Sequence, residues 1–317
     1  MWIASCTKIM TSICVMQLVE RGLVSLDEPV YSHIPELKDF KILQGFNDDG
    51  SAIEMPHKTP ITLRRLLTHT SGIAYAELAP QVMQWLQVTG KDHTKESDLL
   101  PRFAVPLIFE PGAGWMYGAG LDFAGLLVER VSKMSLEEYM KKNIWGPLGV
   151  EEITFFLEQR PDMKEKQMSI GRRDAEGEKT TYRATAPEYR ELNGMQIRDC
   201  MGGQGSYGNA SSYIKVLHAV LTADEDEKLL KKESVDELFR PQLNEAGKAG
   251  FAGLTSFDVA RNSMGLLPKD IEKDYGLGGS VIMGDEEGGR SEGTLVWAGL
   301  PNISWVSSIF LLELGPR

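Results

Sequence analysis

The chain has 317 residues, of which 42% are hydrophobic, and a formal net charge of −11 at pH 7. This length and apolar content are enough to bury a large core in one or two domains. The acidic balance, without a long basic run, argues against a surface that binds nucleic acid. The three cysteines, Cys6, Cys14 and Cys200, are too scattered for a disulfide framework or a zinc site and indicate a reducing, cytoplasmic compartment. The five histidines form no pair at metal-ligand spacing, so we expect no metal and no cofactor.

The first predicted element is an apolar helix from Ser5 to Arg21, which ends at Gly22 because glycine commonly terminates helices. Polar residues interrupt the apolar pattern, no small-residue cleavage site follows, and the run is too short to cross a bilayer. We therefore expect a buried helix, and neither a signal peptide nor a membrane segment.

Further along the chain, the pattern predicts helices and loops first and strands last. The expected helices are 63–69, capped by Thr62, then 97–101, 121–133, a helix that Ser135 opens with a capping box, 211–221 and 233–240. Residues 158–200 are polar and weakly periodic, which indicates a long surface excursion. The β-rich runs 275–283, 293–298 and 303–314 predict an antiparallel meander.

This order of elements predicts an α+β fold with an antiparallel sheet flanked by helices and a mostly helical domain. We expect residues 1–58 and 205–317 to form an α/β sandwich domain, and residues 59–204 to form a helical insertion domain.

The most informative motif is Ser5-Cys6-Thr7-Lys8, in which a lysine follows a serine by one helical turn. Residues three apart on a helix share a face, so Ser5 Oγ and Lys8 Nζ are able to meet at the helix N-terminus. A serine beside a desolvated, neutral lysine is an activated nucleophile. The alternative is a helix-capping serine and a solvated lysine, because such a short match is expected about once by chance. A second match, Ser212-Tyr213-Ile214-Lys215, follows Asn209 and is interpreted as helix capping.

Further stretches, in a fixed order along the chain, carry a family resemblance. They are the run from Arg21 to Asp27, Leu66-Leu67-Thr68-His69-Thr70-Ser71-Gly72-Ile73, Phe109-Glu110-Pro111-Gly112 leading to Trp115-Met116-Tyr117, and the run from Gly293 to Asn302. With Ser5 and Lys8, they resemble the serine β-lactamase and penicillin-binding-protein superfamily. The resemblance is to its esterase and transesterase branch, with class C-like carboxylesterases and the fungal lovastatin-type acyltransferase. It implies a β-lactamase/transpeptidase-like fold.

The resemblance also implies roles for individual residues. Ser5 would attack an acyl carbonyl and carry the acyl group as an ester, and a neutral Lys8 would accept the serine proton. Tyr117 would stabilise the lysine amine and relay a proton to the leaving group, although a packed loop tyrosine is the alternative. Tyr75 matches an active-site tyrosine of the transesterase branch, whereas His69 is interpreted as a structural loop histidine.

A third motif, Trp297-Ala298-Gly299, has a tryptophan where β-lactam-binding members carry a lysine that grips a carboxylate. The resemblance therefore disfavours β-lactam hydrolysis and favours neutral ester or thioester substrates. The backbone N–H groups of Ser5 and Leu300 would form the oxyanion hole.

Two features depart from the family pattern. Tyr117-Gly118-Ala119 lacks the asparagine that many relatives have two residues after the tyrosine. Relatives also carry many more residues ahead of the serine, which form sheet strands, whereas this chain begins four residues ahead of Ser5. We therefore expect the N-terminal strands to be missing, as in a truncated form, with exposed apolar surface.

The sequence thus predicts a serine acyl-transfer enzyme, a transesterase or carboxylesterase, acting through a Ser5 acyl-enzyme. Its partners would be a small acyl ester or thioester, water or an alcohol, and an acyl-carrier protein as donor, in fungal secondary metabolism. The alternative is a catalytically silent relative that binds a small ligand or a partner protein.

A dinucleotide site at Gly203-Gln204-Gly205-Ser206-Tyr207-Gly208 is disfavoured, because the preceding residues 195–200 are too polar for a buried strand. In the resembled family, such a turn closes the floor of the cleft.

Overall fold

The computed structural model describes residues 1–173, 180–183, 197–300 and 302–308. The α-helices are α1 (Thr7–Glu20), α2 (Leu63–Leu67), α3 (Pro80–Thr89), α4 (Leu99–Arg102), α5 (Gly120–Ser132), α6 (Leu136–Met140), α7 (Pro161–Glu165), α8 (Ala210–Leu221), α9 (Ala223–Asp226), α10 (Lys232–Phe239), α11 (Glu245–Thr255) and α12 (Asp258–Ser263). Short turns of other helix types include η1 (Ala4–Cys6), η4 (Ala76–Leu78), η5 (His93–Lys95) and the π-turn η6 (Lys141–Trp145). The strands are β1 (Lys41–Phe46), β2 (Ala52–Pro56), β3 (Ile170–Arg173), β4 (Thr180–Arg183), β5 (Lys273–Tyr275), β6 (Ser280–Ile282), β7 (Leu295–Gly299) and β8 (Ile303–Ser307).

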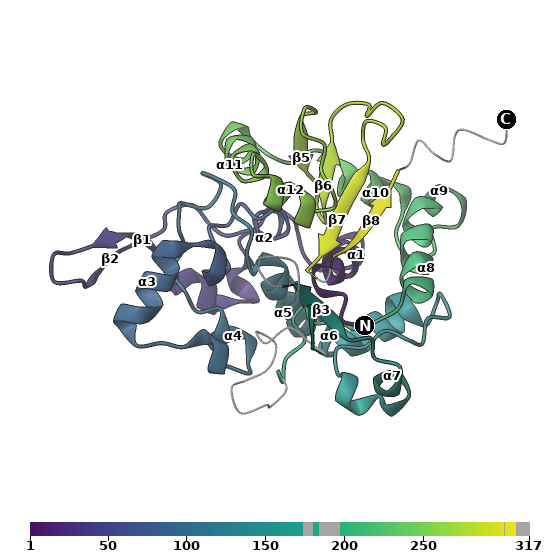
Figure 1. Ribbon diagram of the computed structural model, residues 1–317, viewed down its shortest axis with the longest axis horizontal. Helices are drawn as coiled ribbons and strands as arrows, with labels where there is room; N and C mark the ends of the chain where they lie inside the picture. Colours follow the sequence, from purple (N-terminus) through teal and green to yellow (C-terminus); the bar gives the residue numbers. More distant parts are fainter. Residues whose placement is uncertain (174–179, 184–196, 301, 309–317) are drawn as a thin grey trace.

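The predicted meander is an antiparallel sheet with the strand order β5-β6-β7-β8 (Figure 1). The prediction of one β-rich run over 275–283 was wrong in detail, because the run is two strands joined by a tight turn. Gly276 N donates to Gly279 O at 2.8 Å, and a Cβ on Gly276 would lie 2.4 Å from Leu238 O. The expected run 303–314 begins as β8, and residues 309–314 lie outside the described residues.

Three helices start where the capping residues in the sequence predict. Thr62 accepts from Arg65 N ahead of α2, Ser135 and Glu138 form a capping box ahead of α6, and Asn209 accepts from Ser212 N ahead of α8. These side chains satisfy N–H groups that have no partner inside the helix. The capping of α6 and α8 was therefore predicted correctly from local sequence.

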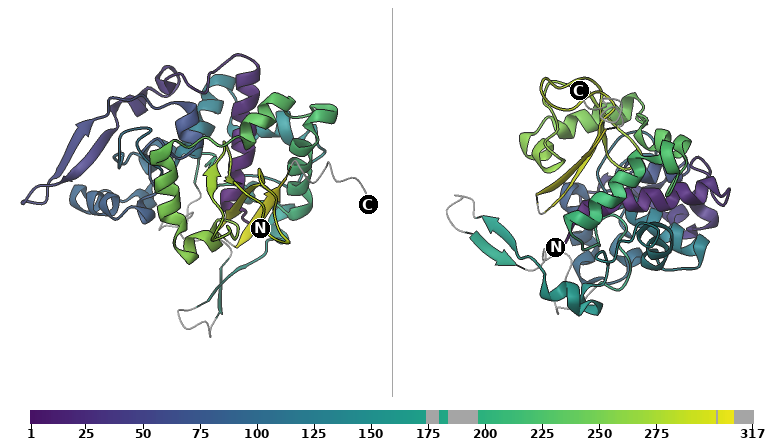
Figure 2. Two further views of the ribbon diagram at one scale, coloured as in Figure 1. Left: turned by 90° about the horizontal axis from the view of Figure 1, so that it is seen from above. Right: turned by 90° about the vertical axis from the view of Figure 1, so that its right-hand side faces the viewer.

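The first helix, α1, lies between the β5–β8 sheet and the helices α5 and α6 (Figure 2). Residues 7–18 are all buried, so this helix has no polar face. Its buried polar side chains bond to other parts of the chain: Thr11 Oγ1 donates to Gly202 O at 2.7 Å and Ser12 Oγ to Leu277 O at 2.5 Å. A helix buried on every side belongs to the core of the molecule.

Two hairpins extend from this body. The hairpin β1–β2 projects at one end (Figure 1), and Leu43 at its base packs with Val82 and Trp85 of α3. The hairpin β3–β4 lies within the predicted surface excursion, of which 174–179 and 184–196 lie outside the described residues.

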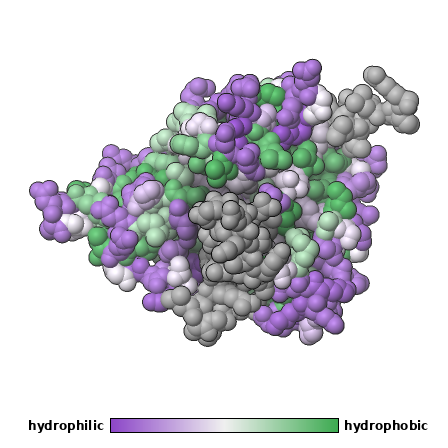
Figure 3. All heavy atoms as spheres, viewed as in Figure 1, coloured by the Kyte–Doolittle hydropathy of each residue, from purple (hydrophilic) through white to green (hydrophobic). Residues whose placement is uncertain are grey.

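The boundaries 1–58, 59–204 and 205–317, and the missing N-terminal strands, stay predictions. Hydrophilic residues cover the loops above the β5–β8 sheet and the end of the molecule around α7 (Figure 3).

Candidate active site

Ser5 lies in the turn η1, immediately ahead of α1, rather than inside the helix. Two neighbouring segments fix this turn: Ile3 N donates to Ser206 O at 3.0 Å, and β7 approaches so closely that a Cβ on Gly299 would lie 2.4 Å from Ile3 O. Ala4 has a φ of +45°, an uncommon value for a residue with a side chain. The backbone ahead of Ser5 is therefore held in a strained turn by its surroundings.

The structure brings the three predicted catalytic side chains together. Lys8 Nζ lies 3.2 Å from Ser5 Oγ, and Tyr117 OH lies 2.5 Å from the same oxygen. Lys8 Nζ also lies 4.6 Å from the centre of the Tyr117 ring. Ser5 Oγ thus has a possible base and a possible proton relay within hydrogen-bond distance, the geometry that an activated nucleophile requires.

Lys8 is fully buried and is held by two further groups. Its Nζ donates to Gly203 O at 2.6 Å and to Tyr75 OH at 3.5 Å. Gly203 belongs to the predicted glycine-rich turn, which accordingly contacts the site. The part of the preceding segment that the structure describes, residues 197–200, forms no strand, so the context of a dinucleotide site is absent there.

Asp122 of α5 is the site residue that sequence reasoning missed. Its Oδ2 accepts from Tyr75 OH at 3.0 Å, and its Oδ1 accepts from Gly203 N at 2.9 Å. Burial raises the pKa of the Asp122 carboxyl, and the charge of Lys8 opposes that rise. The sequence feature that could have identified Asp122 is its place in the otherwise apolar start of a predicted helix. Burial of an aspartate there is unfavourable unless the carboxylate has partners.

The Tyr117 side chain is oriented by its neighbours. A Cβ on Gly118 would lie 2.0 Å from Ile73 O, so only glycine allows this approach of two loops. His69 Nδ1 accepts from Gly118 N at 3.3 Å, and its ring lies 4.7 Å from the Tyr117 ring. Burial, with the charge of Lys8, holds the pKa of His69 well below its usual range, so this histidine is neutral and packs as predicted. Ala119, at the position of the missing asparagine, is fully buried.

A cavity of about 230 Å³ opens beside Ser5. Its wall is mostly apolar and comes from the chain around η1, from η4, from the α4 region and from the end of β7. The lining includes Trp2, Ala4, Ala74, Ala76, Leu78, Phe103, Val105 and Leu300, together with Tyr75, Tyr117 and the polar side chains of Glu77, His93, Arg102 and Gln204.

The third-motif residues occupy different positions around this cavity. Leu300 is 65% exposed and lines the cavity, whereas Trp297 is 1% exposed and packs behind Tyr117 with ring centres 5.3 Å apart. Trp297 therefore supports the Tyr117 ring from behind and does not line the cavity. The substrate-binding roles of Trp297, Gly299, Leu300 and Tyr75 stay predictions.

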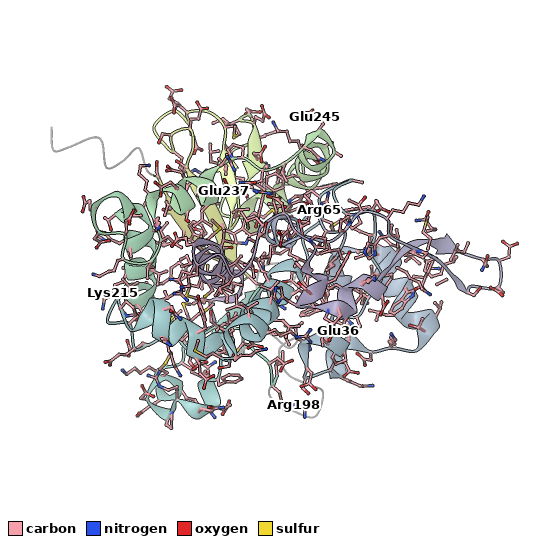
Figure 4. All side chains as sticks on the ribbon, turned by 180° about the vertical axis from the view of Figure 1, so that it is seen from behind. Glu36, Arg65, Arg198, Lys215, Glu237 and Glu245 are labelled. Carbon is pink, nitrogen blue, oxygen red and sulfur yellow. The ribbon has the colours of Figure 1, made fainter. Side chains whose placement is uncertain are left out.

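Two other candidate nucleophiles fail on geometry. Ser212 lies in the first turn of α8, and Lys215 Nζ donates to Gly149 O at 3.0 Å on the exposed side of that helix (Figure 4). Cys6, next to Ser5, is 1% exposed, and burial raises the pKa of its thiol to about 12. A buried thiol with so high a pKa is a poor nucleophile at neutral pH.

The described residues contain no group of three or more His, Cys, Asp and Glu side chains placed to hold a metal ion. None of the described helices has the length and apolar character needed to cross a membrane.

Comparison with known proteins agrees with this geometry. The Beta-lactamase family profile matches residues 1–287. The ML-236A carboxylate methylbutanoyltransferase of Penicillium citrinum is 38% identical over 96% of this chain and 71% of its own length. The lovastatin esterase of Penicillium rubens is 36% identical over 96% of this chain and 75% of its own length. The solved structure of a simvastatin synthase variant from Aspergillus terreus matches with a TM-score of 0.86 at 36% identity, over 98% of this chain and 72% of that one.

The chain therefore belongs to the Beta-lactamase family, within the group that contains fungal acyltransferases and esterases. It has the β-lactamase-type α+β fold and is an enzyme of the serine hydrolase and acyltransferase class.

Proposed function

We propose that this enzyme transfers an acyl group through a covalent ester on Ser5 Oγ, with Lys8 and Tyr117 as its proton-transfer groups. The observation that carries the proposal is the position of Ser5 Oγ, 3.2 Å from Lys8 Nζ, 2.5 Å from Tyr117 OH, and in the wall of the cavity. Short distances from a hydroxyl to both a base and a relay define a nucleophile of this type.

The proposed reaction has two balanced halves. In the first, Ser5 Oγ attacks the acyl carbon while its proton passes to a neutral Lys8, and the alcohol or thiol of the donor leaves with a proton from Tyr117. In the second, water or an acceptor alcohol gives its proton to the deprotonated Tyr117 and attacks the ester, and Ser5 leaves as a hydroxyl with the proton that Lys8 had received. No proton is gained or lost by the enzyme over the cycle.

The tetrahedral intermediate of each half carries a negative oxygen. We assign its stabilisation to the backbone N–H groups of Ser5 and Leu300. Leu300 follows the strand β7, whose Gly299 approaches Ile3, and both Ser5 and Leu300 border the same cavity. Donors fixed in this way stabilise charge as it develops and need no rearrangement.

The cavity and the relatives together favour a neutral ester or thioester with a short, branched acyl group. The relatives are named for transfer of a methylbutanoyl group and for hydrolysis of lovastatin. A mostly apolar cavity of about 230 Å³ has room for such a group. We place the reaction in secondary metabolism in the cytoplasm, where the free cysteines stay reduced, with an acyl-carrier thioester as the natural donor.

Transfer and hydrolysis share the acyl-enzyme and differ in which nucleophile resolves it. The test uses p-nitrophenyl 2-methylbutanoate as donor with increasing concentrations of a hydrophobic secondary alcohol. Released p-nitrophenol counts the acyl groups taken from the donor. A transferase passes a rising share of these acyl groups to the alcohol as the new ester, whereas an esterase yields only the acid. The absence of p-nitrophenol release would support the catalytically silent alternative. Ser212→Ala, which changes the second serine-lysine motif, is the matched control and should behave like the parent chain.

A further inference from the structure

A buried carboxylate faces the proposed base from the opposite helix. Asp122, on the first turn of α5, is fully buried and makes two hydrogen bonds, one from the hydroxyl of Tyr75 and one from the backbone N–H of Gly203. A buried carboxylate is costly unless it has both hydrogen-bond partners and a compensating charge.

The two partners of Asp122 are also two of the groups that hold Lys8. Gly203 accepts from Lys8 Nζ through its carbonyl at 2.6 Å and donates to Asp122 through its N–H at 2.9 Å. The Tyr75 hydroxyl lies 3.5 Å from Lys8 Nζ and 3.0 Å from Asp122 Oδ2. Asp122 therefore contacts both of these groups at once.

The turn packs closely against both side chains at Gly203. A Cβ on Gly203 would lie 2.5 Å from Asp122 Oδ2 and 2.8 Å from Tyr75 OH. A residue with a side chain at this position would therefore clash with the carboxylate and with the tyrosine hydroxyl.

The charges around this centre come from several elements. Lys8 of α1 and Arg102 of α4 act electrostatically on Asp122, and both favour its ionised form. Lys8 also acts on the Cys6 thiol and on His69, whose burial keeps them neutral at neutral pH. The phenols of Tyr75 and Tyr117 complete the groups that face Lys8. Burial acts against the charges of Lys8 and Arg102 and raises the pKa of the Asp122 carboxyl.

We propose that Asp122 is a positioning residue for acyl transfer, which holds Tyr75 and the Gly203 turn around Lys8 and whose charge contributes to the pH dependence of Ser5 acylation. The inference rests on the proposed function, because it assigns Lys8 as the base for Ser5. Asp122 acts through these neighbours and has no contact with the acyl group.

The test is Asp122→Asn, which keeps the shape of the side chain and removes its charge. The rate of Ser5 acylation by a p-nitrophenyl ester is measured from pH 5 to pH 10. A negative charge in the site favours protonated forms of the groups around it, so its removal should move the acid limb of the acylation profile to lower pH. The maximal rate should fall roughly tenfold or more, because the groups that position the lysine lose one of their own partners.

A purely structural aspartate would change the rate or the stability without moving the acid limb. Asp274→Asn is the matched control, because Asp274 is also fully buried but accepts from the backbone N–H groups of Gln242, Leu243 and Tyr275. An Asp122→Asn enzyme with the parental rate and an unmoved acid limb would overturn the proposal.

A second variant covers the case in which Asp122→Asn does not fold. Tyr75→Phe removes the hydroxyl between the carboxylate and Lys8, and it should acylate Ser5 several-fold more slowly than the parent chain. A parental rate in Tyr75→Phe would also overturn the proposal. Failure of the proposed function has a different signature, since the parent chain itself would then form no Ser5 adduct.

Discussion

At the scale of single residues, the site depends on a few hydroxyl and amine groups packed by aromatic rings. Tyr117 OH lies 2.5 Å from Ser5 Oγ, and its ring is enclosed by His69, Trp297 and Tyr75. This packing leaves the hydroxyl as the part of Tyr117 that reaches the nucleophile. The chemistry of Tyr117 can therefore be separated from its packing by removal of one oxygen atom.

We predict that Tyr117→Phe lowers the rate of Ser5 acylation by about 10² to 10⁴, the usual contribution of a positioned proton-transfer group. The melting temperature should change by only a few degrees, because the ring stays packed. Stopped-flow measurement of p-nitrophenol release gives the rate. Tyr139→Phe, at a buried tyrosine whose hydroxyl contacts Arg21, should retain parental activity. Parental activity in Tyr117→Phe would remove the tyrosine from the mechanism.

At the scale of secondary-structure elements, the junction between α5 and α6 joins the site to the rest of the helical core. Glu129, near the end of α5, accepts from Leu136 N at 2.7 Å, just after the Ser135 capping box. Burial raises the pKa of the Glu129 carboxyl to about 7, with Asp199 and Glu138 contributing in the same direction. The folded state therefore favours the protonated form of this carboxyl.

This shift makes stability depend on pH. The folded-state pKa of Glu129 lies above its ordinary value of 4.5, so its stabilising contribution is complete below pH 4.5 and is lost as the pH rises through about 7. Glu129→Gln, which keeps an acceptor for Leu136 N, should be more stable than the parent at pH 8, by on the order of 1 to 2 kcal/mol. The two proteins should be nearly equal at pH 4.5. Urea unfolding at both pH values measures the difference, and a gain of the same size at both would contradict the assignment.

The elements show what local sequence is able to predict. Caps such as Thr62, Ser135 and Asn209 act on the N–H groups of their own helix, so the sequence near each helix predicts its start. The break between β5 and β6 was missed although its signal is local, since Gly276, Gly278 and Gly279 mark a turn and Gly276 N donates to Gly279 O.

In the site, sequence motifs predicted some residues and missed another. Ser5, Lys8 and Tyr117 belong to motifs with fixed spacing, and the structure brings all three together. Asp122 belongs to no motif, and its role depends on Tyr75 and Gly203, which are distant in sequence. The packing of Trp297 behind Tyr117 depends on the three-dimensional arrangement, while its substrate-binding role stays a prediction.

At the scale of the whole molecule, α1 connects the parts that surround the site. Its polar side chains reach in different directions: Thr7 to Ser206, Thr11 to Gly202, Ser12 to Leu277, and Gln17 to Asn143 and Leu229. These bonds join the helix to the glycine-rich turn, to the β5–β6 turn and to the helices near its C-terminal end. The position of Lys8 is therefore set by contacts along the full length of α1.

We predict that Ser12→Ala lowers the free energy of unfolding by about 1 to 3 kcal/mol, because it leaves the buried carbonyl of Leu277 without this donor. Chemical denaturation measures the change. Ser256→Ala is the control, since Ser256 is exposed and bonds only within α11, to Gly253 O, and it should cost less than about 0.5 kcal/mol. Equal effects of the two substitutions would mean that the link from α1 to the sheet contributes nothing measurable.

The central claim is that Ser5 carries the acyl group, and intact-protein mass spectrometry tests it most directly. The parent chain and Ser5→Ala are incubated with p-nitrophenyl 2-methylbutanoate and quenched in acid, and their intact masses are measured. The modified peptide is then sequenced to locate the adduct. The account predicts a single added acyl group on Ser5 in the parent chain and none in Ser5→Ala. An adduct of equal yield in Ser5→Ala, or an adduct on another residue of the parent chain, would contradict it.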